Sequence, residues 1–154
     1  MTFSRFLLAG SLALVSLSAS AQVLSFEKPE DAVAYRQHAF GLLETHFSNL
    51  TAMTLNRIPY DPLQARLDAN AIRVLSRLPF QAFPPGTAQP LANTRATDKV
   101  WTAAPRYADS ARSLQQESDK IHSAVVRGDI TQLRKTLNDA GAICRKCHDQ
   151  FRAR

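Results

Sequence analysis

A short motif near the carboxyl end restricts what this 154-residue chain can fold into. Cys144 and Cys147 are separated by two residues, and His148 follows at once. On a helix, positions i and i+3 project from the same face. Both thiols can therefore reach the two vinyl groups of one porphyrin, while the next residue offers an imidazole to its iron. This C-x-x-C-H pattern is typical of c-type haem attachment, so the motif predicts a haem site carried on a helix.

The same motif has other interpretations, and the rest of the chain argues against them. Cys144 and Cys147 are the only cysteines, so they could form an isolated disulfide or half of a zinc site. A zinc site of the ribbon type needs a second C-x-x-C or a paired histidine, and the chain has neither. A thioredoxin-like C-x-x-C lies near a βαβ pattern early in a domain, whereas this motif ends a helical chain. Haem attachment is therefore favoured.

The first 21 residues are predicted to be a cleaved signal peptide. Arg5 gives a positive n-region, residues 6–17 form an apolar h-region, and residues 19–21 are an A-x-A cleavage site. The segment is too short for a transmembrane anchor. We expect cleavage after Ala21, a single mature domain over residues 22–154, and no membrane span after cleavage. Because c-type haem is attached outside the cytoplasm, a periplasmic location is expected in a Gram-negative source.

The composition limits the classes of partner. The formal net charge is +6, a moderately basic balance that can steer acidic partners. Basic residues are scattered among acidic ones, without an aromatic-interleaved patch, so no nucleic-acid binding is expected. Hydrophobic residues make up 45% of the chain, which is ordinary for a globular protein.

Apolar residues recur at helical spacing in four segments, and no segment alternates as a strand would. The predicted helices cover approximately residues 28–54, 61–78, 97–127 and 130–152. Pro105 lies inside the third segment and either kinks it or marks where the helix proper begins. Two connections are short, and one, at residues 80–97, is long and irregular. The fold class predicted is all-α, an antiparallel up-down-up-down four-helix bundle with covalently bound haem.

The apolar stripes predict which side chains form the core. The aromatic residues of the long loop are also expected to be buried, because exposed aromatics in a loop need a reason. The stripe of the second helix is Leu67, Ala71, Val74 (or Leu75) and Leu78, and that of the fourth is Ile130, Leu133, Leu137, Ala140, Ile143 or Cys144, and Cys147, with Phe151 one turn on.

The chain resembles the cytochrome c′ family of class II c-type cytochromes, which is itself a standard example of an up-down bundle. The C-x-x-C-H motif ends the last helix of an exported bundle, as in that family. The resemblance covers essentially all of the mature chain. The matching segments, in order, are residues 26–33 and 35–37, Pro59–Asp61, Leu78–Phe80, Phe83, residues 85–87, Trp101 and Gly128–Asp129.

The resemblance implies one covalently attached haem c per chain. Cys144 and Cys147 would hold it, and His148 would be the axial iron ligand.

Two departures from the family are visible. Phe151 stands where some relatives carry Tyr, so a hydroxyl role there is absent. The loop at residues 88–97 looks longer than usual, which leaves its haem contacts open, with Arg95 as one candidate.

The resemblance also implies a haem pocket built from distant parts of the chain. Arg36 and Gln37 match residues at the haem edge, Arg36 through a propionate. Phe40, one turn after Arg36, matches the apolar residue that covers the distal face. Arg152, four residues after His148, matches a basic residue beside the proximal histidine. The pocket is expected to include two loop aromatics, Phe80 and Phe83.

The residue at position 40 decides between two functions. A cytochrome that only carries electrons usually has two protein ligands, often His and Met. A low-spin relative would carry Met where this chain has Phe40, and Phe cannot ligate iron. Met53 is thirteen residues further along the helix, about 20 Å away. His38, His46 and His122 are expected to be surface or structural residues.

We therefore expect a five-coordinate, high-spin haem whose apolar distal pocket binds NO or CO, with protection from nitrosative stress as its use. The resemblance implies that NO binding could weaken the His148–iron bond, with Arg152 beside the vacated face. The alternative is an electron carrier in a periplasmic respiratory chain, with an unknown redox partner.

No enzymatic activity is expected, because no general base stands over the iron. Relatives form homodimers, so a homodimer is expected through the first two helices, for which Leu50 and Leu55 could serve.

Overall fold

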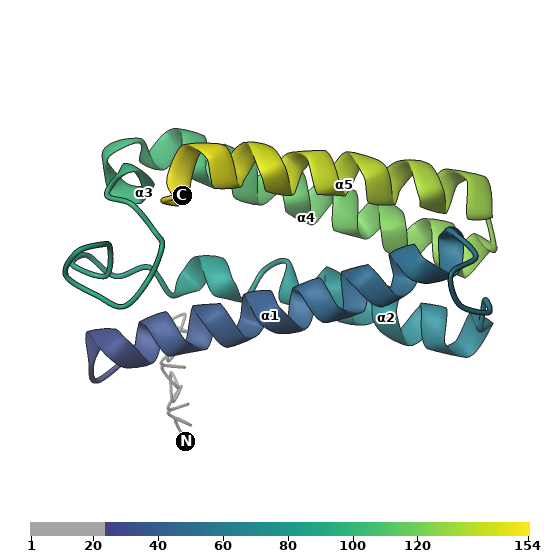
Figure 1. Ribbon diagram of the computed structural model, residues 1–154, viewed down its shortest axis with the longest axis horizontal. Coiled ribbons are helices and arrows are strands. Elements are labelled where there is room, and N and C mark those ends of the chain that lie inside the picture. The colour runs from purple at the N-terminus through teal and green to yellow at the C-terminus, as the bar shows by residue number, and fades with distance from the viewer. Residues whose placement is uncertain (1–23) are drawn as a thin grey trace, which may run out of the picture.

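The computed structural model describes residues 24–154, so the signal peptide predicted at residues 1–21 lies outside the described residues. The four long helices run antiparallel in two layers, α1 with α2 and α4 with α5 (Figure 1). The all-α four-helix bundle is thereby confirmed. Within residues 24–154 there is no named β-strand and no helix long and apolar enough to cross a membrane. The elements are α1 (Pro29–Thr54), α2 (Pro62–Leu75), a 3₁₀ turn η1 (Pro79–Gln81), α3 (Lys99–Thr102), α4 (Ala104–Arg127) and α5 (Ile130–Phe151).

Caps explain where several helices begin and end. Asp61 begins α2 by accepting hydrogen bonds from the backbone N–H groups of Leu63 and Gln64, at 2.8 and 3.2 Å. Asp129 caps α5 in the same way. Gly128 ends α4 with a φ of 69°, a left-handed conformation that glycine adopts without steric cost. These short connections force α1 to lie against α2 and α4 against α5.

The second helix is shorter than its apolar spacing predicts. It ends at Leu75 rather than Leu78, because Pro79 has no N–H to donate to the carbonyl of Leu75. The chain instead tightens into a turn in which the N–H of Arg77 donates to the carbonyl of Val74 at 3.1 Å. The connection to the second layer therefore begins earlier than expected.

The third predicted helix is divided into two. The short helix α3 ends at Thr102, and α4 begins at Ala104 with Pro105 in its first turn. Proline is favoured there, because the first helical N–H groups have no intrahelical partner. Pro105 thus marks the start of the helix proper, which was one of the two expected outcomes.

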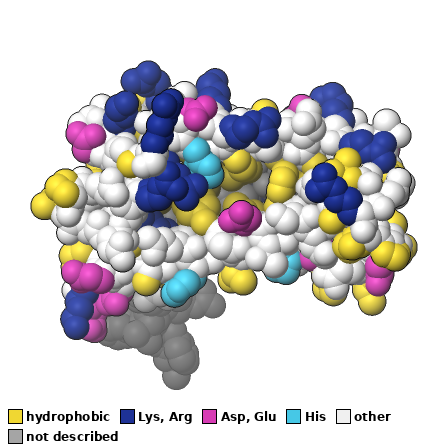
Figure 2. All heavy atoms as spheres, in the orientation of Figure 1, with side chains coloured by type: hydrophobic (Ala, Val, Ile, Leu, Met, Phe, Trp, Pro, Cys, Tyr) yellow, Lys and Arg dark blue, Asp and Glu magenta, His cyan; other side chains and the backbone are white. Residues whose placement is uncertain are grey.

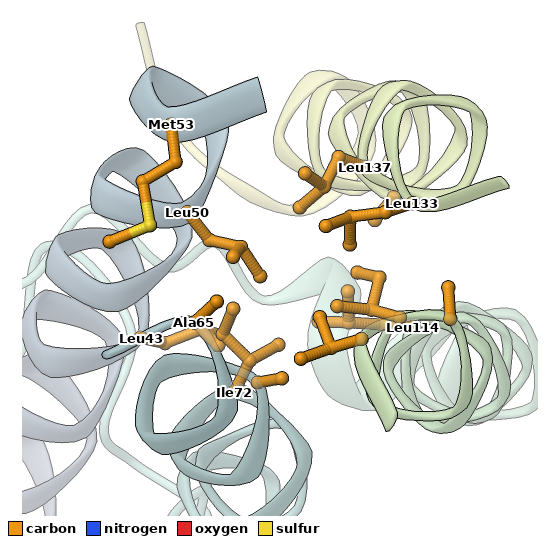
Figure 3. Close-up of a cluster of buried hydrophobic side chains, with 13 residues drawn as sticks. Leu43, Leu50, Met53, Ala65, Ile72, Leu114, Leu133 and Leu137 are labelled. Atoms are coloured by element: carbon orange, nitrogen blue, oxygen red, sulfur yellow. The ribbon is translucent and has the colours of Figure 1, made fainter. Parts of the chain in front are cut away.

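The core lies between the two layers. Figure 3 shows Leu50 of α1, Ile72 of α2, Leu114 of α4 and Leu133 of α5 pointing toward one another. The stripe predicted for α5 is confirmed except at Cys147, which is half-buried, since the other members are buried or pack against this core. The buried cluster comprises Leu43, Leu50, Met53, Ala65, Ala69, Ile72, Leu114, Ile121, Ala124, Val125, Leu133, Leu137 and Ala140.

The face of α2 that enters the core differs from the predicted one. Leu67 and Val74 are 56% and 49% exposed, so their assignment to the core was wrong. Ala65, Ala69 and Ile72 are buried instead. Two of these three side chains are small, which allows α2 to pack closely against its neighbours. The large apolar residues consequently face outward.

The expected contribution of Leu50 to a dimer surface was also wrong. Its side chain is fully buried in the core, so it cannot contact a second copy. Leu55, the other residue expected there, is 45% exposed. The exposed apolar residues on or beside the first two helices are Leu42, Leu55, Ile58, Leu63, Leu67 and Val74.

Replacing Leu133 tests the position of the core. Because Leu133 is fully buried between the layers, Leu133→Ala is expected to lower the free energy of unfolding by about 2–5 kcal/mol. Leu91→Ala serves as the control, since Leu91 is 79% exposed, and is expected to change stability by less than about 0.5 kcal/mol. Denaturant unfolding of both variants measures the difference. Equal changes in the free energy of unfolding of the two variants would show that Leu133 does not lie in the core.

Candidate haem-binding site

Both thiols of the motif lie on the last two turns of α5, as the spacing predicts. Cys144 and Cys147 are free and half-buried. Burial raises the pKa of both thiols, that of Cys147 to about 11, so both are protonated near neutral pH. Addition of each S–H group across a vinyl group of a porphyrin would give a thioether. In residues 24–154 no group of three His, Cys, Asp or Glu side chains could hold a metal ion. The thiols therefore suit a covalently attached porphyrin better than zinc.

His148 is prepared to act as a ligand. Partial desolvation lowers the pKa of its imidazole although part of the residue is exposed, and the nearby charge of Arg152 lowers it further. The neutral imidazole, which binds metals, is consequently favoured near neutral pH. Arg152 ends α5, where its backbone N–H donates to the carbonyl of His148 at 3.0 Å. The basic residue expected beside the histidine is thus in place.

A wall of aromatic rings surrounds the predicted distal residue. The rings of Phe40 and Phe80 meet edge to face, with centroids 5.6 Å apart. Phe80 in turn lies 5.8 Å from Tyr107, and Phe83 lies 5.2 Å from the same ring. Tyr107 also contacts Phe151, at 5.3 Å. The structure therefore brings Phe40, Phe80 and Phe83 together, as expected.

Tyr107 was not among the predicted site residues. Its spacing from the apolar residues of α4 is the one signal that its sequence position offers. Its partners lie on η1, on the following loop and on α5, so its place in the wall depends on a loop conformation that periodicity does not reveal.

Arg36 is buried and bound to the long loop. Its guanidinium donates to the carbonyl of Ala82 at 2.9 Å, to the carbonyl and hydroxyl of Thr87 at 2.5 and 2.8 Å, and to the hydroxyl of Thr94 at 3.2 Å. It also lies 4.1 Å from the ring centre of Phe83. The side chain expected at the haem edge therefore organises the loop that carries the aromatic wall.

The positive charge of Arg36 has no anionic partner. The ion pairs in the described part of the chain do not include it. Only 2% of the residue is exposed, and burial lowers the pKa of its guanidinium. A buried cation that meets only neutral acceptors is costly. A carboxylate of a bound haem would supply the missing negative charge.

The remainder of the loop closes this end of the bundle. Gln37 donates its side-chain amide to the carbonyl of Asn93 at 3.0 Å. Arg95 is exposed, and its side chain donates to the carbonyl of Ala153 at 2.9 Å. The N–H of Thr97 donates to the carbonyl of Phe151 at 3.0 Å. The loop is thus fastened both to α1 and to the end of α5.

Two layers leave space beside the motif. A cleft of about 640 Å³ lies between α1 and α5, and Phe47, Gly141 and Arg145 line it at the end nearest Cys144. Figure 2 shows a hollow between these helices with hydrophobic side chains on its floor and a histidine at its rim. Polar and apolar side chains both line this cleft, and it extends along α5 toward the motif without including either thiol or His148.

Two other candidate ligands, His46 and Met53, are occupied elsewhere. His46 contacts the buried carboxylate of Asp68 at 2.8 Å, and Asn49 and Gln64 donate to the same group. This network joins α1 to α2 and explains the burial of Asp68. Met53 lies in the core, 3% exposed. Neither side chain is available to an iron near His148.

Comparisons with known proteins agree with these features. The family model described as cytochrome C′ matches residues 31–152. Cytochrome c′ of Alcaligenes xylosoxydans xylosoxydans is 36% identical over 127 residues, covering 82% of this chain and 97% of that protein. Cytochrome c′ of Rubrivivax gelatinosus is 35% identical over 127 residues, covering 82% and 98%.

Solved structures are similar as well. The crystal structure of cytochrome c′ from Rubrivivax gelatinosus has a TM-score of 0.78 at 35% identity, covering 83% of this chain and 99% of that one. A nitric oxide complex of a mutant cytochrome c prime from Alcaligenes xylosoxidans has a TM-score of 0.78 at 35% identity, covering 84% and 99%. Cytochrome c prime from Shewanella frigidimarina has a TM-score of 0.80 at 27% identity, covering 84% and 100%.

Replacing Arg36 tests its role in holding the loop. Arg36→Met keeps most of the side-chain volume but removes all four hydrogen bonds, so residues 82–94 should open and be cleaved faster in limited proteolysis. Gln37→Ala is the control, because exposed Gln37 makes one hydrogen bond to the same loop. Its cleavage rate should stay close to that of the wild type. Equal rates in all three proteins would contradict the role assigned to Arg36.

Proposed function

Because the chain belongs to the cytochrome c′ family, we propose that it is an exported haemoprotein that binds small diatomic gases at a five-coordinate, high-spin iron. Members of this family carry covalently bound haem c. Cys144 and Cys147 would hold the haem through thioethers, and His148 would ligate its iron from one side. When bound, the haem supplies an iron that is redox-active and can take a diatomic gas at an open position.

The observation that carries this proposal is the position of Phe40. Its ring is held edge-on against Phe80 in the aromatic wall, where relatives with two protein ligands would need a coordinating atom. Met53 and His46 are committed to the core and to Asp68. Neither of these two side chains is free to complete the coordination of the iron.

The chemistry of the wall favours some gases over others. Phe40 and Phe80 have no donor for a hydrogen bond, so they offer no stabilisation to a polar Fe–O₂ unit. Their bulk also obstructs large ligands. Small neutral molecules that bind iron strongly, NO and CO, are therefore the proposed ligands. A nitric oxide complex of a mutant cytochrome c prime from Alcaligenes xylosoxidans supports this assignment.

On the side of His148, opposite Phe40, Arg152 adds a positive charge. Its charge acts on the imidazole of His148, and its backbone amide fixes the end of the same helix. We place Arg152 as the residue that would interact with a ligand arriving on the His148 side.

A homodimer and an exported location complete the proposal. The outer face of α2 presents Leu63, Leu67 and Val74, which are 70%, 56% and 49% exposed. A contiguous apolar face of this kind is suited to a second copy of the chain. The predicted signal peptide, with cleavage after Ala21, supports export to the periplasm.

Electron transfer is the second candidate function. His148 is exposed at the end of α5, and the charges of Arg95 and Arg152 both act on it. A basic surface beside a redox centre could attract an acidic periplasmic redox partner. The two functions differ in whether the iron keeps an open coordination position.

Shortening residue 40 tests the distal role directly. Phe40→Ala removes the ring that obstructs the open position, so the affinity of the ferrous protein for CO should rise by about tenfold or more, equivalent to about 1.4 kcal/mol or more. Phe26→Ala is the matched control, because Phe26 packs on Tyr35 at the start of α1 and away from the wall. CO titration measures both. An unchanged CO affinity in Phe40→Ala would show that Phe40 does not obstruct the open position of the iron.

A further inference from the structure

The hydroxyl of Tyr107 is buried and has no hydrogen-bond partner in the part of the chain that the structure describes. A buried tyrosine hydroxyl normally has a partner, because leaving such a group unpaired is unfavourable. Its ring contacts Phe80, Phe83 and Phe151, none of which can accept a conventional hydrogen bond. The polypeptide by itself therefore does not explain why this position carries Tyr rather than Phe.

An unpaired charge lies on the same side of the site. The guanidinium of Arg36 packs on the ring of Phe83 at 4.1 Å, and that ring is 5.2 Å from the ring of Tyr107. Arg36 meets only carbonyl and hydroxyl oxygens. A buried donor and a buried cation, both beside Phe83, each lack the same thing, which is an anionic acceptor.

The thiol that would carry the haem is close to Tyr107. The ring of Tyr107 contacts Phe151, which lies one helical turn beyond Cys147 on α5, and burial raises the pKa of the Tyr107 hydroxyl above its usual range. A thioether at Cys147 would therefore bring the haem next to this hydroxyl. Haem carries carboxylates of its own, which accept hydrogen bonds and need positive charge nearby.

We propose that Tyr107 is a positioning residue of the haem pocket, whose hydroxyl donates a hydrogen bond to a haem carboxylate on the side where Arg36 supplies the positive charge. The inference rests on haem attachment at Cys144 and Cys147. It gives the aromatic wall a polar contact that orients the haem without placing a donor over the gas. Phenol-to-carboxylate hydrogen bonds are short and strong, so this contact resists rotation of the ring.

Resonance Raman spectroscopy of the ferrous holoprotein tests the contact. In Tyr107→Phe the propionate bending band should move to lower frequency, because the carboxylate loses its donor. The midpoint potential should fall, because the less compensated carboxylate favours ferric iron. Tyr35→Phe is the control, since Tyr35 packs on Phe26 at the start of α1, and neither quantity should change. In the wild type, transfer to heavy water should move the same band without any substitution.

Two results would overturn the proposal. If the propionate band stays fixed in Tyr107→Phe while the C–O stretching band of the CO complex moves, the hydroxyl faces the gas instead. If neither band moves, and heavy water has no effect on the wild type, the hydroxyl contacts no polar group of the haem. CO binding by the same wild-type sample reports separately on the proposed gas-binding function, which can fail while the propionate result stands.

Discussion

The guanidinium of Arg36 is the contact on which the site end of the bundle depends. Through four hydrogen bonds it holds the loop at residues 82–94 against α1. The residues that follow, Arg95 and Thr97, form hydrogen bonds with the end of α5. η1 and this loop carry Phe80 and Phe83, and Arg36 packs on the ring of Phe83, so Arg36 helps to position the aromatic wall. The burial of a charge that no carboxylate of the described residues neutralises is costly, which links the stability of the loop to the anion that a haem would bring.

One part of the bundle is filled by the aliphatic core, and the end that carries the motif is lined by aromatic rings. Aliphatic side chains from all four long helices fill the space between the layers, with Leu50 and Leu133 fully buried. Toward the end of α5 aromatic rings replace them, and the thiols face that space only half-buried. The motif is therefore supported by a rigid helix whose other turns are anchored in the core. Such a scaffold can hold a large planar group while leaving one of its faces to Phe40.

The sequence predicted the features that depend on local chemistry or on helical period. The C-x-x-C-H motif predicts the haem-attachment residues of α5, and caps such as Asp61 and Gly128 marked helix ends. Periodicity failed for α2, because its exposed leucines recur at the same spacing as its buried alanines, and period alone cannot say which stripe faces inward. The loop contacts of Arg36 and the place of Tyr107 in the wall depend on non-local packing, so no spacing rule could have predicted them. The pairing of His46 with Asp68 was hidden for the same reason.

An iron with one open coordination position is the central claim, and the optical spectrum of the reduced holoprotein before and after addition of CO tests it most directly. Because Phe40 cannot ligate iron and Met53 and His46 are engaged elsewhere, the ferrous protein should give a high-spin, five-coordinate spectrum that changes when CO is added. A low-spin spectrum that CO leaves unchanged would contradict the account and favour an electron carrier.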